Sequence, residues 1–209
     1  MKNFKGLVAN YKNAINENTK EHFHHLAVKG QSPKIMVIGC CDSRVDPDYL
    51  FQAKPGEIFV SRNVANLVPP YEPDDSYRGT STAIEFAVQG LKVEHIVIMG
   101  HSLCGGIRAC CEGVKGEKVE GVFLPIWTSM LKDEAEKILK ENEDTDIEVL
   151  AEKVEKQGIR FSLKNLKTFP FIAEAIAEER LQIHGAYFDI KTTQLYVLDQ
   201  ETDEFLVVE

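Results

Sequence analysis

Two short apolar runs in this chain each end in glycine followed by a side chain that binds metal ions. Residues 34–39 (KIMVIG) lead into Cys40, and residues 95–100 (HIVIMG) lead into His101. Runs of four or five apolar residues rich in Ile and Val are typical of strands buried on both faces of a parallel sheet. Residues 57–60 (EIFV) are a third candidate strand. The pattern therefore predicts a sheet in the interior of the protein.

Stretches with helical spacing alternate with these strands. Residues 80–91 carry apolar side chains on one face, and further helices are predicted at residues 131–140, 147–156 and 171–180. In the last part of the chain, alternating apolar and polar residues predict strands at residues 182–190, 194–198 and 205–208. These strands are expected to form a hairpin-like addition at the sheet edge. We predict an α/β fold whose central sheet has about four parallel strands plus an antiparallel edge, flanked by helices. Residues 1–30 are predicted to form an N-terminal helical arm.

Length and charge narrow the class of protein. A chain of 209 residues is long enough for one domain with a substantial core, and we assign residues 1–209 to a single domain. Its net charge of -9 argues against nucleic acid as a partner, which would need a basic surface. The first ten residues are too polar for a signal peptide, and no apolar stretch approaches the roughly 20 residues of a membrane span. We therefore expect a cytoplasmic protein that is not bound to a membrane.

The cysteine count favours metal binding or catalysis over disulfides. There are five cysteines, an odd number, at positions 40, 41, 104, 110 and 111. Thiols stay reduced in a cytosol. We interpret Cys110 and Cys111 as small buried thiols on a helix that follows Gly105 and Gly106. A redox protein that uses Cys40 and Cys41 is an alternative function.

Three of the candidate ligands are predicted to meet at one edge of the sheet. The carboxyl ends of parallel strands, where Cys40 and His101 fall, form the edge at which ligands bind. Cys104 lies three residues after His101, at a tight turn into a helix. Two thiols and one imidazole would hold Zn²⁺ and leave one coordination position open, as in catalytic zinc sites. Asp42 and Arg44 follow Cys40 closely enough to form an ion pair, which would orient the carboxylate as a hydrogen-bond acceptor.

These two segments resemble the signature motifs of the β-class carbonic anhydrases. The motifs are Cys40-x-Asp42-Ser43-Arg44 and His101-x-x-Cys104, and further matches are residues 62–66 (RNVAN) and 163–172 (LKNLKTFPFI). The resemblance extends from about residue 31 to the C-terminus.

The resemblance implies an enzyme that interconverts CO2 and bicarbonate. By this resemblance, Cys40, His101 and Cys104 hold Zn²⁺, and a zinc-bound hydroxide oriented by Asp42 and Arg44 attacks CO2. The family also implies a homodimer, or a multiple of dimers, with each active site at the subunit interface. We accordingly expect the arm at residues 1–30 to pack on a partner subunit. The implied substrate pocket comprises Gln31, Phe59, Val64, Phe86 and Gly105.

Within the family, the chain is similar to the plant-type, non-allosteric subclass. Gln31 stands nine residues before the first ligand, and Val37 replaces the Trp of the allosteric bicarbonate pocket. The Tyr of that pocket aligns with Phe188, although Arg62 is kept. Two departures concern the plant-type pattern itself: a pocket Tyr aligns with Phe86, and a nearby His aligns with Gly90, so the chain lacks the groups of a Tyr-assisted proton relay.

Charge counting predicts how the rate depends on pH. Two thiolates neutralise the charge of Zn²⁺, whereas a site of three histidines keeps both positive charges and acidifies its water to pH ~7. The neutral site should acidify water less, so we expect CO2 hydration to accelerate toward alkaline pH.

Two further functions fit the same fold. A non-catalytic zinc protein would use Asp42 as a fourth permanent ligand, which requires its pair with Arg44 to break. Alternatively, the site could hydrolyse COS or CS2, since these are small linear molecules like CO2.

Overall fold

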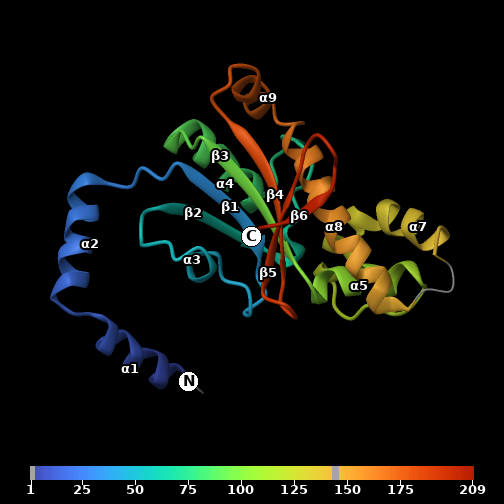
Figure 1. Cartoon of the computed structure of the whole chain (residues 1–209), viewed down its shortest axis with the longest axis horizontal. Coiled ribbons are helices and arrows are strands. Elements are labelled where there is room, and N and C mark those ends of the chain that lie inside the picture. The colour runs from blue at the N-terminus through green and yellow to red at the C-terminus, as the bar shows by residue number, and fades with distance from the viewer. Residues whose placement is uncertain (1–2, 143–145) are drawn as a thin grey trace.

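The computed structural model describes residues 3–142 and 146–209, and its centre is a six-stranded sheet (Figure 1). Its strand order is β2-β1-β3-β4-β5-β6. The strands are β1 (Ile35–Cys40), β2 (Ile58–Asn63), β3 (His95–His101), β4 (Gln182–Asp189), β5 (Gln194–Leu198) and β6 (Phe205–Val207). Strands β2, β1, β3 and β4 are parallel, and β5 and β6 are antiparallel to their neighbours. The predicted mostly parallel sheet with an antiparallel edge is confirmed.

Several predicted boundaries were wrong. Strand β4 forms the predicted hairpin with β5, but it also pairs in parallel with β3, so it lies inside the sheet rather than at its edge. Strand β2 continues to Asn63, and the helix predicted at residues 147–156 continues as α8 to Leu166. The helix predicted at residues 80–91 divides into α4 (Gly79–Glu85) and a π-helical segment, η2 (Phe86–Leu91).

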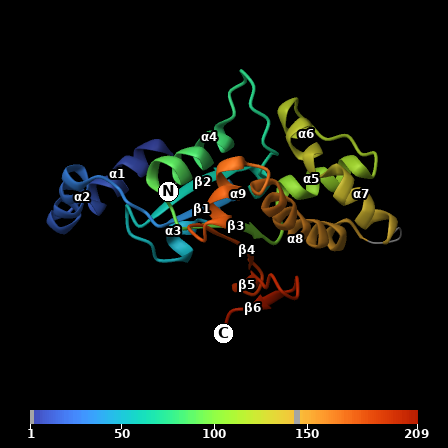
Figure 2. The same ribbon diagram turned by 90° about the horizontal axis from the view of Figure 1, so that it is seen from above.

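One face of the sheet is covered by α4, η2, α8 (Ile147–Leu166) and α9 (Pro170–Ala177), whereas α3 (Pro47–Leu50) lies on the other face (Figure 2). The main core lies under the larger helical layer and includes Met36 and Ile38 of β1 and Ile96 and Ile98 of β3. A second cluster forms beyond the carboxyl ends of the parallel strands. It contains η1 (Val64–Asn66), α5 (Gly105–Val114), α6 (Phe123–Thr128), η3 (Ser129–Leu131) and α7 (Lys132–Lys140).

Helix α8 approaches the sheet closely because two strand positions lack a side chain. A Cβ atom at Gly100 or at Gly185 would lie 2.9 Å from an Ile159 side-chain carbon. Contacts this short do not occur in packed interiors, so both glycines are needed for Ile159 to sit where it does. The close contact fixes where α8 passes the end of β3, and therefore which of its residues reach the candidate site.

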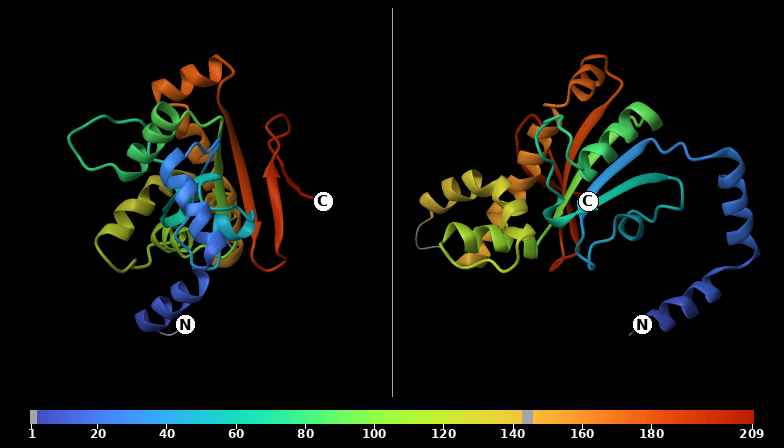
Figure 3. Two further views of the ribbon diagram at one scale, coloured as in Figure 1. Left: turned by 90° about the vertical axis from the view of Figure 1, so that its left-hand side faces the viewer. Right: turned by 180° about the vertical axis from the view of Figure 1, so that it is seen from behind.

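The N-terminal arm comprises α1 (Phe4–Ala14) and α2 (Glu17–Lys29); α1 extends away from the body, whereas α2 contacts it where Nε2 of His22 donates to the carbonyl of Pro55 (Figures 1 and 3). The side chains of Asn3 and Asn16 cap the two helices by accepting hydrogen bonds from backbone N–H groups. No residue of either helix is buried, although α1 exposes the apolar side chains of Phe4 and Tyr11. Among the described residues, no helix is long and apolar enough to cross a membrane.

Candidate active site

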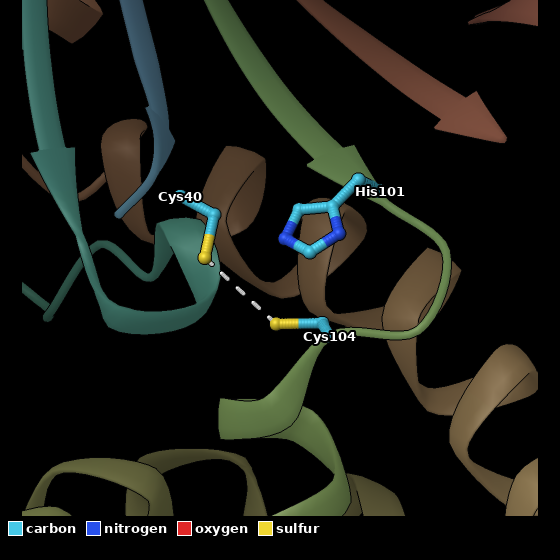
Figure 4. A group of neighbouring side chains, drawn as sticks. All are labelled: Cys40, His101 and Cys104. Carbon is cyan, nitrogen blue, oxygen red and sulfur yellow. Dashed lines mark hydrogen bonds between the residues drawn. The ribbon is translucent and has the colours of Figure 1, made fainter. Parts of the chain in front are cut away.

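The three predicted metal ligands come together at the carboxyl ends of β1 and β3 (Figure 4). Cys40 is the last residue of β1, His101 is the last residue of β3, and Cys104 immediately precedes α5. Their ligand atoms all lie within 4.8 Å of one another, and all three residues are buried. Adjacent parallel strands end at the same edge, which is why residues 61 positions apart in the sequence meet here.

Hydrogen bonds orient the three side chains toward a common point. The Nδ1 atom of His101 donates to the carbonyl of Ser102 at 2.9 Å, which leaves the Nε2 lone pair free. Nε2 is buried, and no residue in the described parts of the chain hydrogen-bonds to it. The thiol groups of Cys40 and Cys104 are 3.9 Å apart, and the backbone N–H of Ala65 donates to the sulfur of Cys40. The hydrogen bond from Cys104 lowers the pKa of Cys40, whereas the same contact raises that of Cys104.

This arrangement fits a zinc ion. Two sulfur ligands about 2.3 Å from a tetrahedral zinc are separated by about 3.8 Å, close to the observed 3.9 Å. A buried imidazole nitrogen without a partner is costly unless a ligand occupies it. Histidine bound to a metal also commonly donates its other N–H to a carbonyl group, as His101 does to Ser102. The donor set of two thiols and one imidazole is one that Zn²⁺ prefers.

Asp42 is paired with Arg44 beside this group of ligands. Oδ1 of Asp42 accepts hydrogen bonds from the backbone N–H and from Nε of Arg44, both at 2.9 Å, and Oδ2 accepts one from Nη2 at 2.7 Å. The hydrogen bonds from the Arg44 side chain hold the pKa of Asp42 well below its usual range, so the carboxylate stays ionised at neutral pH. Oδ2 of Asp42 lies 4.0 Å from Nε2 of His101. Arg44 also donates to the carbonyl of Leu103, which links the two signature segments.

Arg62 holds the loop that carries Asp42. Its guanidinium donates to the carbonyls of Cys40 (2.8 Å), Asp42 (2.7 Å) and Val45 (3.0 Å), and to the carboxylate of Asp46 (2.9 Å). A guanidinium has five N–H donors in a rigid fork, so four acceptors arranged around it fix the course of the loop.

The predicted substrate-pocket residues divide into two groups. Val64 and Gly105 lie near the ligands, since Val64 contacts the first turn of α5 at Gly106. The other three predicted residues lie elsewhere in the chain, namely Gln31, Phe59 and Phe86. Gln31 precedes β1, and Phe59 pairs with Met36 of that strand, about 13 Å from its carboxyl end at the usual rise per residue. Phe59 and Phe86 are in contact, with ring centroids 5.9 Å apart, and Phe86 is half exposed.

Three residues near the site were missed by the sequence analysis. The indole N–H of Trp127 donates to the carbonyl of Val64 at 2.7 Å. Glu155, on α8, accepts hydrogen bonds from the backbone N–H of Cys104 and from the hydroxyl of Tyr187, both at 2.9 Å. Burial raises the pKa of Glu155, and its two hydrogen bonds oppose the shift. One feature of the sequence could have identified Glu155: it lies on the apolar face of the predicted helix, four residues from Ala151 and four from Ile159.

Comparisons with known proteins agree on one family. The family model described as carbonic anhydrase matches residues 35–195. Beta carbonic anhydrase 3 of Arabidopsis thaliana is 35% identical over 179 residues, which cover 83% of this chain and 68% of that protein.

Solved structures of β-carbonic anhydrases are also similar. CcaA superposes with a TM-score of 0.84 at 28% identity, covering 98% of this chain and 90% of that one. CafA of Aspergillus fumigatus gives a TM-score of 0.81 at 31% identity, with 94% and 90% covered. A tetrameric enzyme of Sordaria macrospora gives 0.76 at 34% identity, with 93% and 92% covered. The matched segment contains both signature motifs and all three candidate ligands, and the chain therefore belongs to the β-class carbonic anhydrase family.

Proposed function

We propose that this protein catalyses the reversible hydration of CO2 to bicarbonate and a proton, with Zn²⁺ held by Cys40, His101 and Cys104. When bound, the zinc ion supplies Lewis-acid activation of water as a nucleophile. The observation that carries the proposal is the position of Asp42, whose carboxylate is held by Arg44 beside the three ligands.

Asp42 has one acceptor site left for the reaction. Its Oδ1 accepts two hydrogen bonds and its Oδ2 accepts one, so Oδ2 keeps a lone pair on the side of His101. An ionised carboxylate can only accept, so it would take a hydrogen bond from the nucleophile and leave a nucleophile lone pair directed at CO2. Arg44 keeps the carboxylate ionised and in place.

The same pairing favours this proposal over the non-catalytic zinc protein. As a fourth ligand, Asp42 would have to exchange its bidentate contact with Arg44 for the metal. Those hydrogen bonds join two charged groups and are among the stronger ones in proteins.

Stopped-flow measurement of CO2 hydration, with the zinc content determined on the same sample, tests the proposal. We expect a zinc-loaded protein that hydrates CO2 and loses this activity when a chelator removes the metal. A zinc-loaded protein that hydrolyses COS or CS2 but does not hydrate CO2 would replace the proposal by that alternative. Activity that survives complete metal removal would refute it.

We propose further that the functional unit is a homodimer whose partner supplies Gln31, Phe59 and Phe86 to each site. These residues lie away from the ligands of their own chain. An apolar groove of about 900 Å³ opens beside the site, between Val64, Tyr77 and Trp127. Exposed Phe123 and Ile126 of α6 line this groove as well, and the arm exposes apolar side chains that a partner could cover.

Light scattering coupled to size exclusion would give the mass in solution, which we expect to be that of a dimer or a multiple of it. Mixing inactive Asp42→Asn chains with inactive Gln31→Ala chains should then restore part of the activity, because a mixed dimer contains one site with neither substitution. A monomeric, fully active protein would refute the shared site.

A further inference from the structure

A buried carboxylate lies directly behind one of the metal ligands. Glu155 is only 4% exposed, and its Oε1 accepts a hydrogen bond from the backbone N–H of Cys104 at 2.9 Å. Its Oε2 accepts one from the hydroxyl of Tyr187, also at 2.9 Å. Tyr187 is itself 2% exposed, on β4. The two hydrogen bonds fix both oxygens of the carboxylate.

Packing alone does not explain a glutamate at this position. Its neighbours on the buried side of α8 are Ala151, Val154 and Ile159, all of them apolar. A buried carboxylate costs free energy that an apolar side chain of similar size would avoid. Among the described residues, Glu155 forms hydrogen bonds with Cys104 and Tyr187 and none with Asp42 or Arg44, so the proposed reaction does not account for it either. Its specific contact is the turn that presents Cys104.

That turn needs to be held in place. Leu103 has a left-handed backbone conformation, with φ of 61°, which is unfavourable for a residue other than glycine. No side chain caps the N-terminus of α5 at Cys104. Three hydrogen bonds to other parts of the chain hold the turn instead. The hydroxyl of Ser102 donates to Asp189, Arg44 donates to the carbonyl of Leu103, and the N–H of Cys104 donates to Glu155.

The position of Glu155 follows from the packing of α8. Ile159, one turn further along the helix, is seated against Gly100 and Gly185. Gly100 immediately precedes the candidate ligand His101, so its contact with Ile159 fixes the position of α8 relative to the end of β3. This close packing brings Glu155, one turn before Ile159, to the backbone of Cys104.

We propose that Glu155 is a positioning residue for the zinc site, and that it holds Cys104 in ligating geometry by accepting the hydrogen bond from its N–H. The inference rests on the proposed zinc site. Residues that orient metal ligands typically change metal affinity by about 10- to 100-fold when they are substituted. Because the acceptor atom is what matters, a glutamine should replace Glu155 far better than an alanine.

Zinc release to a colour-forming chelator, measured on the purified zinc-loaded protein, tests this proposal. We expect Glu155→Ala to release zinc about 10- to 100-fold faster than the wild type, and Glu155→Gln to remain close to the wild type. The cobalt-substituted proteins give a second readout, since the thiolate-to-cobalt absorption of Glu155→Ala should shift and that of Glu155→Gln should not. Asn165→Ala is the matched control, because Asn165 is buried on the same helix and donates to the carbonyl of Val68 at 2.8 Å. It should lower the melting temperature and leave zinc release unchanged.

Three results would overturn the proposal while leaving the proposed function intact. These are wild-type zinc release by Glu155→Ala, equally fast release by Glu155→Gln and Glu155→Ala, and equally fast release by Asn165→Ala. The last would show that any destabilisation of α8 loosens the metal. A wild-type protein that binds neither zinc nor cobalt would overturn the proposed function as well.

Discussion

Replacing Asp42 by Asn should separate catalysis from metal binding. The asparagine has nearly the shape of the aspartate, but only one of its two terminal atoms can accept a hydrogen bond. If its oxygen keeps the contacts that Oδ1 now makes with the backbone N–H and Nε of Arg44, its NH2 group takes the place of Oδ2. That NH2 group would then face Nη2 of Arg44, where the aspartate has a hydrogen bond of 2.7 Å. Two donors would oppose each other there.

The loss can be put on an energy scale. Each 1.4 kcal/mol corresponds to a factor of about 10 in rate, but only interactions that change between the ground state and the transition state alter the rate. The protein already makes the Oδ2 contact with Arg44 before it reacts, so losing this contact slows the reaction by displacing the side chain at position 42 from the nucleophile. The variant also loses the acceptor for the nucleophile, a kind of contribution that typically amounts to about 10²–10⁴. We expect kcat/KM to fall by at least about 10²-fold.

The folding stability should change much less than the rate. The side chain of Arg44 is 47% exposed, and ion pairs at such positions usually contribute about 0–1 kcal/mol to stability. The assay is stopped-flow CO2 hydration on Asp42→Asn with its zinc content and melting temperature measured in parallel. Asp46→Asn is the control, because Asp46 pairs with Arg62 on the same loop, and asparagine can still cap α3. The control should keep its zinc and most of its activity.

Two outcomes would refute this reasoning. Full activity of a zinc-loaded Asp42→Asn protein would show that the carboxylate does not orient the nucleophile. Loss of zinc together with activity would identify Asp42 as a metal ligand, as in the non-catalytic alternative.

Further predictions concern the metal, the core and the pH dependence. Cys104→Ala should abolish zinc retention in elemental analysis, because three ligands leave no redundancy. Gly185→Ala should lower the free energy of unfolding by about 1–3 kcal/mol in urea titrations, since its Cβ would lie 2.9 Å from Ile159; an unchanged midpoint would contradict the close packing of α8. Burial raises the pKa of Cys110 to about 11 and that of Cys111 to about 12, so at pH ~8 both stay protonated and should resist iodoacetamide until the protein unfolds. CO2 hydration should accelerate from pH ~6 to ~9, and a flat profile would contradict the charge-neutral zinc site.

Much of the fold was readable from the sequence because its signals are local. The apolar runs that end at Cys40 and His101 identified two adjacent parallel strands, and their terminal residues are two of the three candidate metal ligands. The spacing within the first signature segment was sufficient to predict the pair of Asp42 and Arg44, since both residues lie on one short loop. Local pattern indicated the hairpin of β4 and β5, whereas the parallel pairing of β4 with β3, which places β4 inside the sheet, is a tertiary contact.

The sequence by itself therefore determined the candidate ligand set, the pair of Asp42 and Arg44, and the order of strands and helices that brings them to one sheet edge. Only the tertiary structure showed that Asp42 forms a bidentate pair with Arg44 beside the candidate ligands, and that Glu155 accepts a hydrogen bond from Cys104, 51 residues away in the sequence. The physical reason is that the hydrophobic pattern of a strand or helix indicates which of its faces is buried. The pattern does not indicate which residues of a distant element pack against that face. Gly100 and Gly185 illustrate this point, because only the tertiary structure shows that the absence of side chains at these positions makes room for Ile159 of α8.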